Sequence, residues 1–214
     1  MDITTASEKR YTAKKYDAHR KIDAETLSKV ETLLRTAPSS VNSQPWHYVI
    51  AGTDQGRDLI AQAADEHYAM NSGKIRDASH VVVFCVRDDL DEAHLQAILA
   101  QEDKDGRFAN AEARSATDKG RHFFANANKP RMQDWMSRQV YLSLGYMLMG
   151  VAALGLDSTP IEGIDVDRLD ELLKLREKGL RSLVVATLGY HADDDFNASL
   201  PKSRLPADVT VTHL

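Results

Sequence analysis

The sequence contains very little cysteine, since Cys85 is the only one in 214 residues. A single cysteine excludes a disulfide within the chain and is typical of a reducing compartment. We therefore expect a cytoplasmic protein, and the first residues contain no apolar segment like that of a secretory signal. Cys85 lies within the apolar run 81–86, where a buried structural thiol is expected and a catalytic one is not.

Long apolar runs and an excess of positive charge are also missing. No segment approaches the ~18 consecutive apolar residues of a membrane-spanning helix. The formal net charge is -5, whereas a surface that binds nucleic acid usually carries a basic excess. We therefore expect neither a membrane nor a nucleic acid as a partner. Hydrophobic residues make up 43% of the chain, which is enough to bury a sizeable core.

The common motifs of nucleotide, nucleophilic and metal chemistry are absent as well. No G-x-G-x-x-G follows a predicted strand, and the sequence has no Walker A loop and no G-x-S-x-G elbow. The eight histidines are scattered, without H-E-x-x-H or C-x-x-C spacing, so no metal site is predicted. What remains for binding is a set of polar and basic side chains.

The spacing of apolar residues predicts helices and strands in irregular order. Helices are expected over 23–36, 53–64, 92–102 and 134–156, and strands over 47–52, 81–86, 182–189 and 208–213. The helix over 134–156 is apolar on nearly all sides, which indicates burial in a core or in a subunit interface. A polar, helix-permissive segment over 110–128 predicts a helical excursion at about 92–131. Together these elements predict an α+β fold with a mixed central sheet flanked by helices.

Three short polar stretches stand out against this background. The first is Arg10-Tyr11-Thr12-Ala13-Lys14, and the second is the connection "PSSVNSQP" over 38–45. The third is Pro201-Lys202-Ser203-Arg204-Leu205-Pro206. Prolines stiffen the backbone around the second and third stretches and so preset the direction of their side chains. Arginine and lysine in such a frame suit a phosphate group, while a solvated surface is the plainer interpretation of each basic pair.

These stretches, taken in order along the whole chain, resemble the FMN-dependent nitroreductase family, and most closely its enterobacterial, oxygen-insensitive branch. No single block would be specific, but many occur in the same order. The blocks are "PSSVNSQPWH" (38–47), "DASHVVVFC" (77–85), "QED" (101–103), "DGRFA" (105–109), "QVYL" (139–142), "VAALGLD" (151–157), "PIEG" (160–163) and the stretch 196–206.

The resemblance implies one FMN-binding domain over 1–214 and a homodimer with two FMN molecules at the subunit interface. It also implies that the C-terminal strand of each subunit is exchanged with the partner. The implied reaction is ping-pong: NADH or NADPH reduces the flavin, and a nitroaromatic or quinone then takes two electrons without sensitivity to oxygen. No catalytic side chain is implied beyond the flavin itself, which supplies the hydride chemistry.

Carried over residue by residue, the resemblance implies a cofactor site and an adjoining substrate site. The residues implied at the FMN phosphate, with Tyr11 in the same stretch, are Arg10, Thr12, Lys202 and Arg204. Those implied at the pyrimidine side of the flavin are Lys14, Asn71 and Lys74. Those implied around the rest of the cofactor are Ser39, Ser40, Asn42, Gln139, Pro160, Ile161, Glu162 and Gly163, with a backbone N–H of Glu162–Gly163 near flavin N5. Those implied for the substrate and nicotinamide are Lys14, Val41, Tyr68, Lys74, Arg107 and Phe124.

Two other functions remain open on the sequence. One is a dihydropteridine or flavin reductase on the same fold, and the other is an FMN-binding module without turnover. Lys14 and Lys74 speak against the module, because lysines beside the pyrimidine ring stabilise a reduced flavin. Tyr11, Val41 and the segment 125–131 depart from the pattern of the family on the substrate side. The sequence chooses neither the physiological acceptor nor NADH over NADPH.

Overall fold

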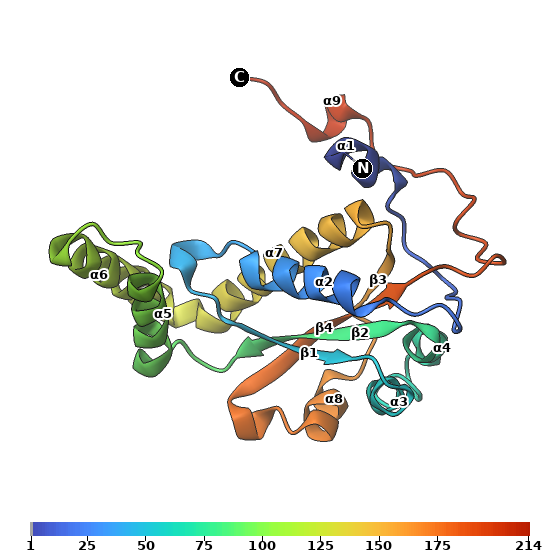
Figure 1. The fold of residues 1–214 in the computed structure, drawn as a ribbon, viewed down its shortest axis with the longest axis horizontal. Coiled ribbons are helices and arrows are strands. Elements are labelled where there is room, and N and C mark those ends of the chain that lie inside the picture. The colour runs from blue at the N-terminus through green and yellow to red at the C-terminus, as the bar shows by residue number, and fades with distance from the viewer. Residues whose placement is uncertain (1) are drawn as a thin grey trace.

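A computed structural model describes residues 2–214 as a central sheet with helices on both faces (Figure 1). Its helices are α1 (Ile3–Lys9), α2 (Ala24–Thr36), α3 (Asp54–Ala61), α4 (Ala69–Asp77), α5 (Glu92–Lys104), α6 (Ala111–Asn128), α7 (Met132–Ala153), α8 (Val166–Leu173) and α9 (Ala207–Thr210). Its strands are β1 (Trp46–Ala51), β2 (His80–Arg87), β3 (Asp157–Ile161) and β4 (Leu180–Gly189). Three 3₁₀ turns complete it: η1 (Ser40–Asn42), η2 (Lys129–Arg131) and η3 (Arg176–Lys178). The predicted α+β class is confirmed.

The sheet has the strand order β1-β2-β4-β3, and all of its strand pairs are antiparallel. The prediction of a mixed sheet is therefore wrong for the strands of the single chain. Parallel pairing is limited, within residues 2–214, to an isolated bridge between Thr12 and Ser158. A strand buried on both faces has the same continuous apolar sequence in either orientation, so the pattern of β2 did not reveal its direction.

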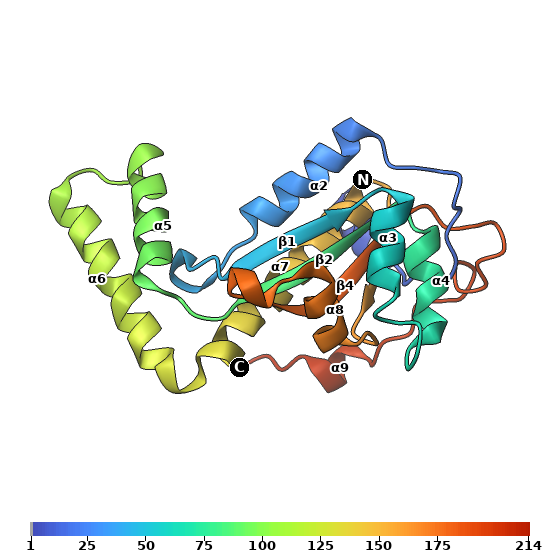
Figure 2. The same ribbon diagram turned by 90° about the horizontal axis from the view of Figure 1, so that it is seen from below.

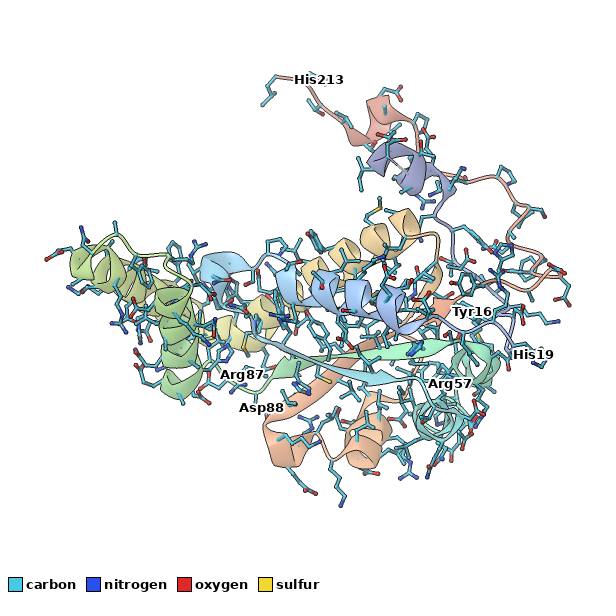
Figure 3. The ribbon with its side chains drawn as sticks, viewed as in Figure 1. Tyr16, His19, Arg57, Arg87, Asp88 and His213 are labelled. Atoms are coloured by element: carbon cyan, nitrogen blue, oxygen red, sulfur yellow. The ribbon has the colours of Figure 1, made fainter. Side chains whose placement is uncertain are left out.

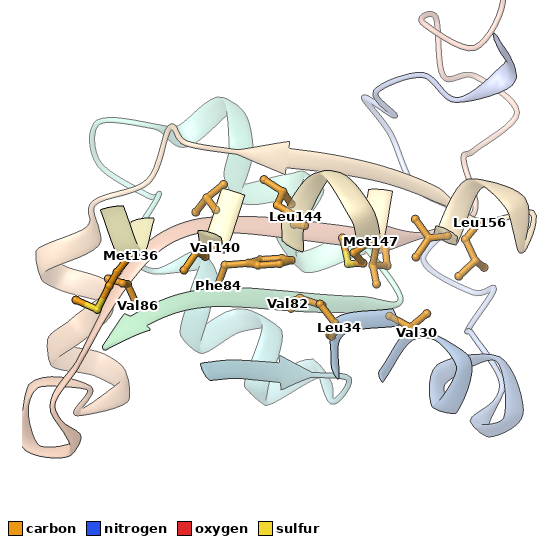
Figure 4. Packing of buried hydrophobic residues seen from close by; sticks show 14 of the residues in the cluster. Val30, Leu34, Val82, Phe84, Val86, Met136, Val140, Leu144, Met147 and Leu156 are labelled. Carbon is orange, nitrogen blue, oxygen red and sulfur yellow. The ribbon is translucent and has the colours of Figure 1, made fainter. Parts of the chain in front are cut away.

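The two faces of β2 belong to two separate cores. Val82, Phe84 and Val86 face α2 and α7, where they pack with residues such as Leu34 and Met147 (Figure 4). The alternate residues of β2 face the opposite side, which α3, α4 and α8 cover (Figure 1). Successive side chains of a strand point to opposite faces, so one apolar run serves both layers. This double burial fixes β2 at the centre of the molecule.

Cys85 belongs to the second core and is fully buried. Burial raises the pKa of its thiol to about 12, so the thiolate needed for nucleophilic chemistry does not form at neutral pH. The expected structural role of Cys85 is confirmed.

Helices α5 and α6 extend to one side of the sheet and its covering helices (Figure 2). The two ends of this insertion are held together at its base. Gln133, at the start of α7, donates hydrogen bonds to the carbonyl oxygens of Arg87 (3.1 Å), the last residue of β2, and of Asp88 (2.5 Å), which follows it. Figure 3 labels Arg87 and Asp88 at this end of the sheet. The insertion therefore leaves and rejoins the main body at one point.

Helix α7 is buried on one side only. Met136, Val140 and Met147 are fully buried against the sheet, whereas Tyr141, Leu142 and Tyr146 on the other side are 40%, 48% and 42% exposed. As predicted, α7 has apolar residues on nearly all sides, but only one side is buried. In the single chain, its outer side is an uncovered apolar surface.

The C-terminal strand expected over 208–213 does not form in the single chain, and its exchange with a partner subunit stays a prediction. Residues 207–210 make one turn of helix, α9, and the last residues belong to no strand. Val209 and Val211 are 63% and 52% exposed, and His213 lies away from the sheet (Figure 3). The alternation of valine and threonine favours a β-strand. Within the single chain, however, no neighbouring strand pairs with this segment.

Candidate functional site

The N-terminal stretch 10–16 runs along the outer edge of β3. Thr12 bridges to Ser158 of β3, and Tyr16 bridges to His191 just after β4. Tyr16 is buried, and its hydroxyl lies within hydrogen-bonding distance of Thr159 (3.2 Å) and of the carbonyl oxygen of Thr187 (3.1 Å). Figure 3 shows Tyr16 at the end of the sheet opposite Arg87. These contacts fix the position of the basic residues that precede Tyr16.

A pocket of about 300 Å³ lies between this stretch and the segment 197–204. It brings together the four residues implied for a phosphate, namely Arg10, Thr12, Lys202 and Arg204. The Nζ of Lys202 donates to the carbonyl oxygens of Ser7 and Arg10, both at 2.5 Å. Segments almost 200 residues apart in the sequence therefore form one basic pocket, the phosphate clamp.

The cations of the clamp outnumber its one carboxylate, that of Glu8. Burial lowers the pKa of Arg10, and the adjacent Arg204 lowers it further. Burial, Arg10 and Arg204 lower the pKa of Lys202. None of the ion pairs within residues 2–214 includes Arg10, Lys14, Lys74, Lys202 or Arg204. Glu8 also lines the pocket, and its charge opposes the lowering of the Lys202 pKa. Three crowded cations beside one carboxylate are stabilised further when an anion binds between them.

A second group of implied residues surrounds the turn that follows β3. Asn71 Nδ2 donates to the carbonyl oxygen of Gly163 at 2.8 Å, and Lys74 Nζ donates to Asn71 Oδ1 at 2.8 Å. A Cβ added to Gly163 would lie 2.7 Å from Asn71 Nδ2 and 3.1 Å from Tyr68 Cδ1. A larger residue there would displace the side chain of Asn71 or Tyr68, so glycine allows their close approach. The N–H of Gly163 has no acceptor within residues 2–214, which leaves it available to a ligand.

Lys14 connects this second group with the phosphate clamp. Burial lowers the pKa of Lys74, and the positive charge of Lys14 lowers it further, which places the two ammonium groups near each other. Lys14 is four positions after Arg10, so at most about 14 Å of chain separates their backbones. A ligand that reaches both ends is elongated, with an anionic group at one end and an electron-rich group at the other.

The connection 39–44 is held in an unusual backbone conformation. Val41, Asn42 and Gln44 have positive φ angles of 50°, 52° and 42°, which is uncommon and strained for residues other than glycine. The N–H of Ser40 donates to Gln139 Oε1 at 2.8 Å, and the N–H of Gln44 donates to Ser39 Oγ at 3.0 Å. Ser39, Ser40, Asn42 and Gln139 are thus brought together as implied, and strain of this kind is concentrated at binding sites.

A buried ion pair between α5 and α6 contacts this connection. Arg121 of α6 donates two hydrogen bonds to Glu102 of α5, at 2.7 Å and 2.8 Å, and their side chains are only 2% and 6% exposed. Arg121 Nε also donates to the carbonyl oxygen of Val41 at 3.0 Å, and Asn42 Nδ2 donates to Glu102 Oε1 at 2.8 Å. One ion pair therefore holds two helices and the strained connection together.

Arg107 and Phe124 lie on the insertion, apart from the phosphate clamp. Arg107 lines a cavity of about 830 Å³ with Asn42 and Gln44. Phe124 is 48% exposed and makes an edge-to-face contact with Phe123 at 5.5 Å. No hydrogen bond within residues 2–214 joins the connection 39–44 to the phosphate clamp or to the Gly163 turn. One chain therefore presents two separate parts of the implied site.

Pro160 and Ile161 differ from the other implied residues. Both are in β3, where they pair with Ala186 and Val185 of β4. The side chain of Ile161 is buried in the second core. Ile161 can therefore line a ligand through its backbone only.

Sequence reasoning missed two residues that hold the site in place. Asp195 is 4% exposed and accepts hydrogen bonds from the Tyr11 hydroxyl and the Lys14 N–H, both at 3.1 Å. Tyr141 of α7 donates to Glu162 Oε1 at 2.7 Å, and burial raises the pKa of its hydroxyl to about 12, with Glu162 adding to the shift. Asp195 ends an acidic run, 193–195, that resembles a solvated surface, so the sequence offered no signal for it.

Neither a metal centre nor a transmembrane helix emerges from the described part of the chain. No group of three or more histidine, cysteine, aspartate or glutamate side chains could hold a metal ion within residues 2–214. Across the same residues, every helix is too short or too polar to cross a bilayer.

Comparison with known proteins agrees with this architecture. The model of the nitroreductase family matches residues 8–190, which is most of the chain. The chain belongs to the nitroreductase family, and the resemblance read from its motifs is confirmed.

Individual relatives narrow the comparison. The chain is 49% identical over 217 residues to the oxygen-insensitive NAD(P)H nitroreductase of Salmonella typhimurium, with 100% of both chains covered. It is 48% identical over 215 residues to the enzyme of the same name from Enterobacter cloacae, with 99% of each covered. The major NAD(P)H-flavin oxidoreductase of Aliivibrio fischeri is 33% identical, with 97% of this chain and 96% of the relative covered.

The fold also matches solved structures. A protein from Exiguobacterium sibiricum, solved in complex with FMN, superposes with a TM-score of 0.85 at 20% identity. The match covers 100% of this chain and 98% of that one. At this identity the likeness establishes the shared fold.

Proposed function

We propose that this protein is an FMN-dependent NAD(P)H oxidoreductase that reduces nitroaromatics and quinones by two electrons, without sensitivity to oxygen. The observation that carries the proposal is the phosphate clamp, in which Arg10, Lys202 and Arg204 gather without forming an ion pair. Lys14, in the same N-terminal stretch, forms a second basic pair with Lys74. The enterobacterial relatives and the FMN-containing structural neighbour support the same assignment. We further propose a single domain over 1–214 in a cytoplasmic protein.

The described residues fit FMN along its whole length. Arg10, Lys202 and Arg204 would hold its phosphate, because charged donors and a phosphate make strong hydrogen bonds. Lys14 and Lys74 would place positive charge beside the pyrimidine side of the flavin, where charge increases on reduction. FMN supplies the hydride chemistry when it is bound.

Two segments would position the ring of the flavin. The free N–H of Gly163 offers a donor that cannot act as a competing base, and Asn71 holds the carbonyl oxygen of the same residue. The strained connection 39–44 would give a rigid cradle with little entropy left to lose on binding.

The proposal is tested by following the colour of the purified protein. A yellow protein that bleaches with NADH or NADPH under anaerobic conditions, and recovers its colour with a nitroaromatic, would support it. Yellow protein that stays oxidised with both nicotinamides would instead indicate a binding module. The A. fischeri relative makes a flavin reductase the second candidate, and competition between free FMN, a pteridine and a nitroaromatic would separate these activities.

We further propose a homodimer in which the segment 208–213 of each subunit pairs with its partner. The outer edge of β1 has no neighbouring strand in the single chain, and the 830 Å³ cavity lies along it between α2 and α5. An unpaired edge accepts an added strand. The uncovered side of α7 offers the apolar surface that a stable interface needs. A dimer would also bring the two separate parts of the site together.

This proposal predicts a dimer at micromolar concentration in sedimentation velocity. Val211→Asp should weaken the dimer, because it places a charge on the apolar side of the expected strand. Thr212→Asp, on the opposite side, is the matched control and should leave the dimer intact. A well-folded parent monomer at micromolar concentration would contradict the prediction.

Phe124 is predicted to control which acceptors enter. It is half exposed on a helix with few buried apolar residues, and such segments are locally mobile. Phe124→Ala should change the ratio of kcat/KM between a bulky and a small acceptor by about tenfold, about the effect of losing an aromatic contact worth ~1.4 kcal/mol. FMN content should stay near that of the parent. Loss of the flavin from Phe124→Ala would identify Phe124 as a cofactor contact instead.

A further inference from the structure

The position of α6 depends on polar contacts more than on apolar packing. Ala125 is its one buried apolar residue within the described chain, while Phe123 and Phe124 are 68% and 48% exposed. Figure 2 shows α5 and α6 side by side, away from the helices that cover the sheet. The aromatic pair therefore has little packing of its own to hold it.

His122, next to the aromatic pair, contacts α5 through one ring nitrogen and its own helix, α6, through the other. Nε2 lies 2.8 Å from Glu92 Oε2 at the start of α5. Nδ1 lies 2.9 Å from the carbonyl oxygen of Asp118 and 3.3 Å from its Oδ1. Gln96 reinforces the group by donating to Glu92 Oε1 at 2.9 Å and to Asp118 Oδ1 at 3.4 Å.

These contacts require a proton on both ring nitrogens. A carbonyl oxygen and an ionised carboxylate accept hydrogen bonds and donate none. A neutral imidazole carries one N–H. Its other ring nitrogen would then face an oxygen that also only accepts, and no hydrogen bond could form there. The charged groups that face the ring are Glu92 from α5 and Asp118 from α6, and both favour the imidazolium. The hydrogen bond to Glu92, followed by that to Asp118, raises the pKa of His122.

We propose that protonated His122 is a positioning residue that fastens α6 to α5 and thereby sets the place of the Phe123–Phe124 pair. A group whose pKa is raised on folding stabilises the folded contact fully at low pH and loses it as pH rises through the folded value. The contact is thus fully formed below the ordinary histidine pKa of ~6.5, and it weakens as the pH rises through the higher pKa of the folded protein. The consequence for acceptor choice rests on the proposed function, whereas the fastening of α6 does not.

The fastening is tested by hydrogen exchange of the α6 amides at about pH 6 and about pH 8.5, corrected for the intrinsic exchange rate. Because the groups are partly exposed, we expect protection in the parent to be roughly two- to fivefold higher at the lower pH. In His122→Lys the α6 amides should stay protected at both pH values, because lysine keeps the positive charge. In His122→Gln they should be weakly protected at both. His19→Gln removes an exposed histidine whose ring makes no hydrogen bond or ion pair within residues 2–214; it is the control and should behave as the parent.

The consequence for acceptors is tested on the same variants. The ratio of KM between a bulky and a small quinone should change with pH in the parent and in His19→Gln, and should stay constant in His122→Lys and His122→Gln. Equal protection of α6 at both pH values in the parent, or pH dependence that survives in His122→Gln, would overturn the proposal. If the protection of α6 changes with pH but the KM ratio does not, then His122 does not position the aromatic pair. Absence of any reduction would contradict the proposed function, and the exchange experiment would still decide the fastening.

Discussion

Arg204→Ala should weaken the binding of FMN by roughly ten- to a hundredfold. A hydrogen bond to a charged group is worth roughly 1.5–3 kcal/mol, and each ~1.4 kcal/mol is tenfold in affinity. Arg204 lines the phosphate clamp together with Arg10 and Lys202. Combining it with Lys202→Ala should weaken FMN further, although less than additively because both residues would bind one phosphate. Titration of the apo-protein followed by flavin fluorescence measures both affinities.

Riboflavin and a second lysine provide the controls for this experiment. Riboflavin lacks the phosphate, so it should bind the parent far more weakly than FMN and should not distinguish parent from variants. Lys15 pairs with Asp194 at the surface, so Lys15→Ala removes one positive charge nearby and should leave FMN affinity almost unchanged. Equal affinity of the parent for riboflavin and FMN would show that the clamp is only a solvated basic surface.

Arg121→Met should lower the free energy of unfolding by about 3–5 kcal/mol, because it leaves the buried carboxylate of Glu102 without its partner. Urea unfolding at fixed protein and flavin concentrations measures this, since both concentrations affect the apparent stability. The connection 39–44 should also loosen, because Arg121 holds the carbonyl oxygen of Val41. A decrease in FMN affinity would report that second effect.

Two further variants isolate the role of burial. Arg168→Met breaks an ion pair with Glu171 that is 51% and 71% exposed, and it should cost less than about 1 kcal/mol. Adding Glu102→Leu to Arg121→Met should recover much of the loss, since removing both charges leaves no buried ion unpaired. Nη1 of Arg121 already lacks a hydrogen-bond partner. Equal effects of Arg121→Met and Arg168→Met would show that burial does not strengthen the pair.

The elements with strong local signals were predictable from the sequence. Asp23 and Asn110 cap α2 and α6 as their side chains accept hydrogen bonds from the first turn, and these boundaries follow from residue type. The centre of β2 was clear because six consecutive residues, 81–86, are apolar, and all six are buried. The motifs around Ser39, Asn42 and Lys202 identified the family without any structure.

Other features depend on contacts between distant segments, and no local pattern encodes them. Strand β3 was missed because "DSTPI" has no apolar run and contains Pro160; proline is tolerated there because β3 is an edge strand. The strand expected over 208–213 needs a neighbour that one chain does not supply. Asp195 has the same sequence context as Asp194, yet only Asp195 is buried, because the N-terminal stretch lies over it.

The phosphate clamp has a consequence for how the protein is made. Lys202 contacts Ser7 and Arg10, which precede it by 195 and 192 residues. A ribosome releases Arg10 early and Lys202 late, and a growing chain folds in the order in which its parts emerge. All four strands therefore leave the ribosome before the clamp can close on an anion. Ligand capture is a late event that acts on an assembled sheet, and it cannot serve as a template for the nascent chain.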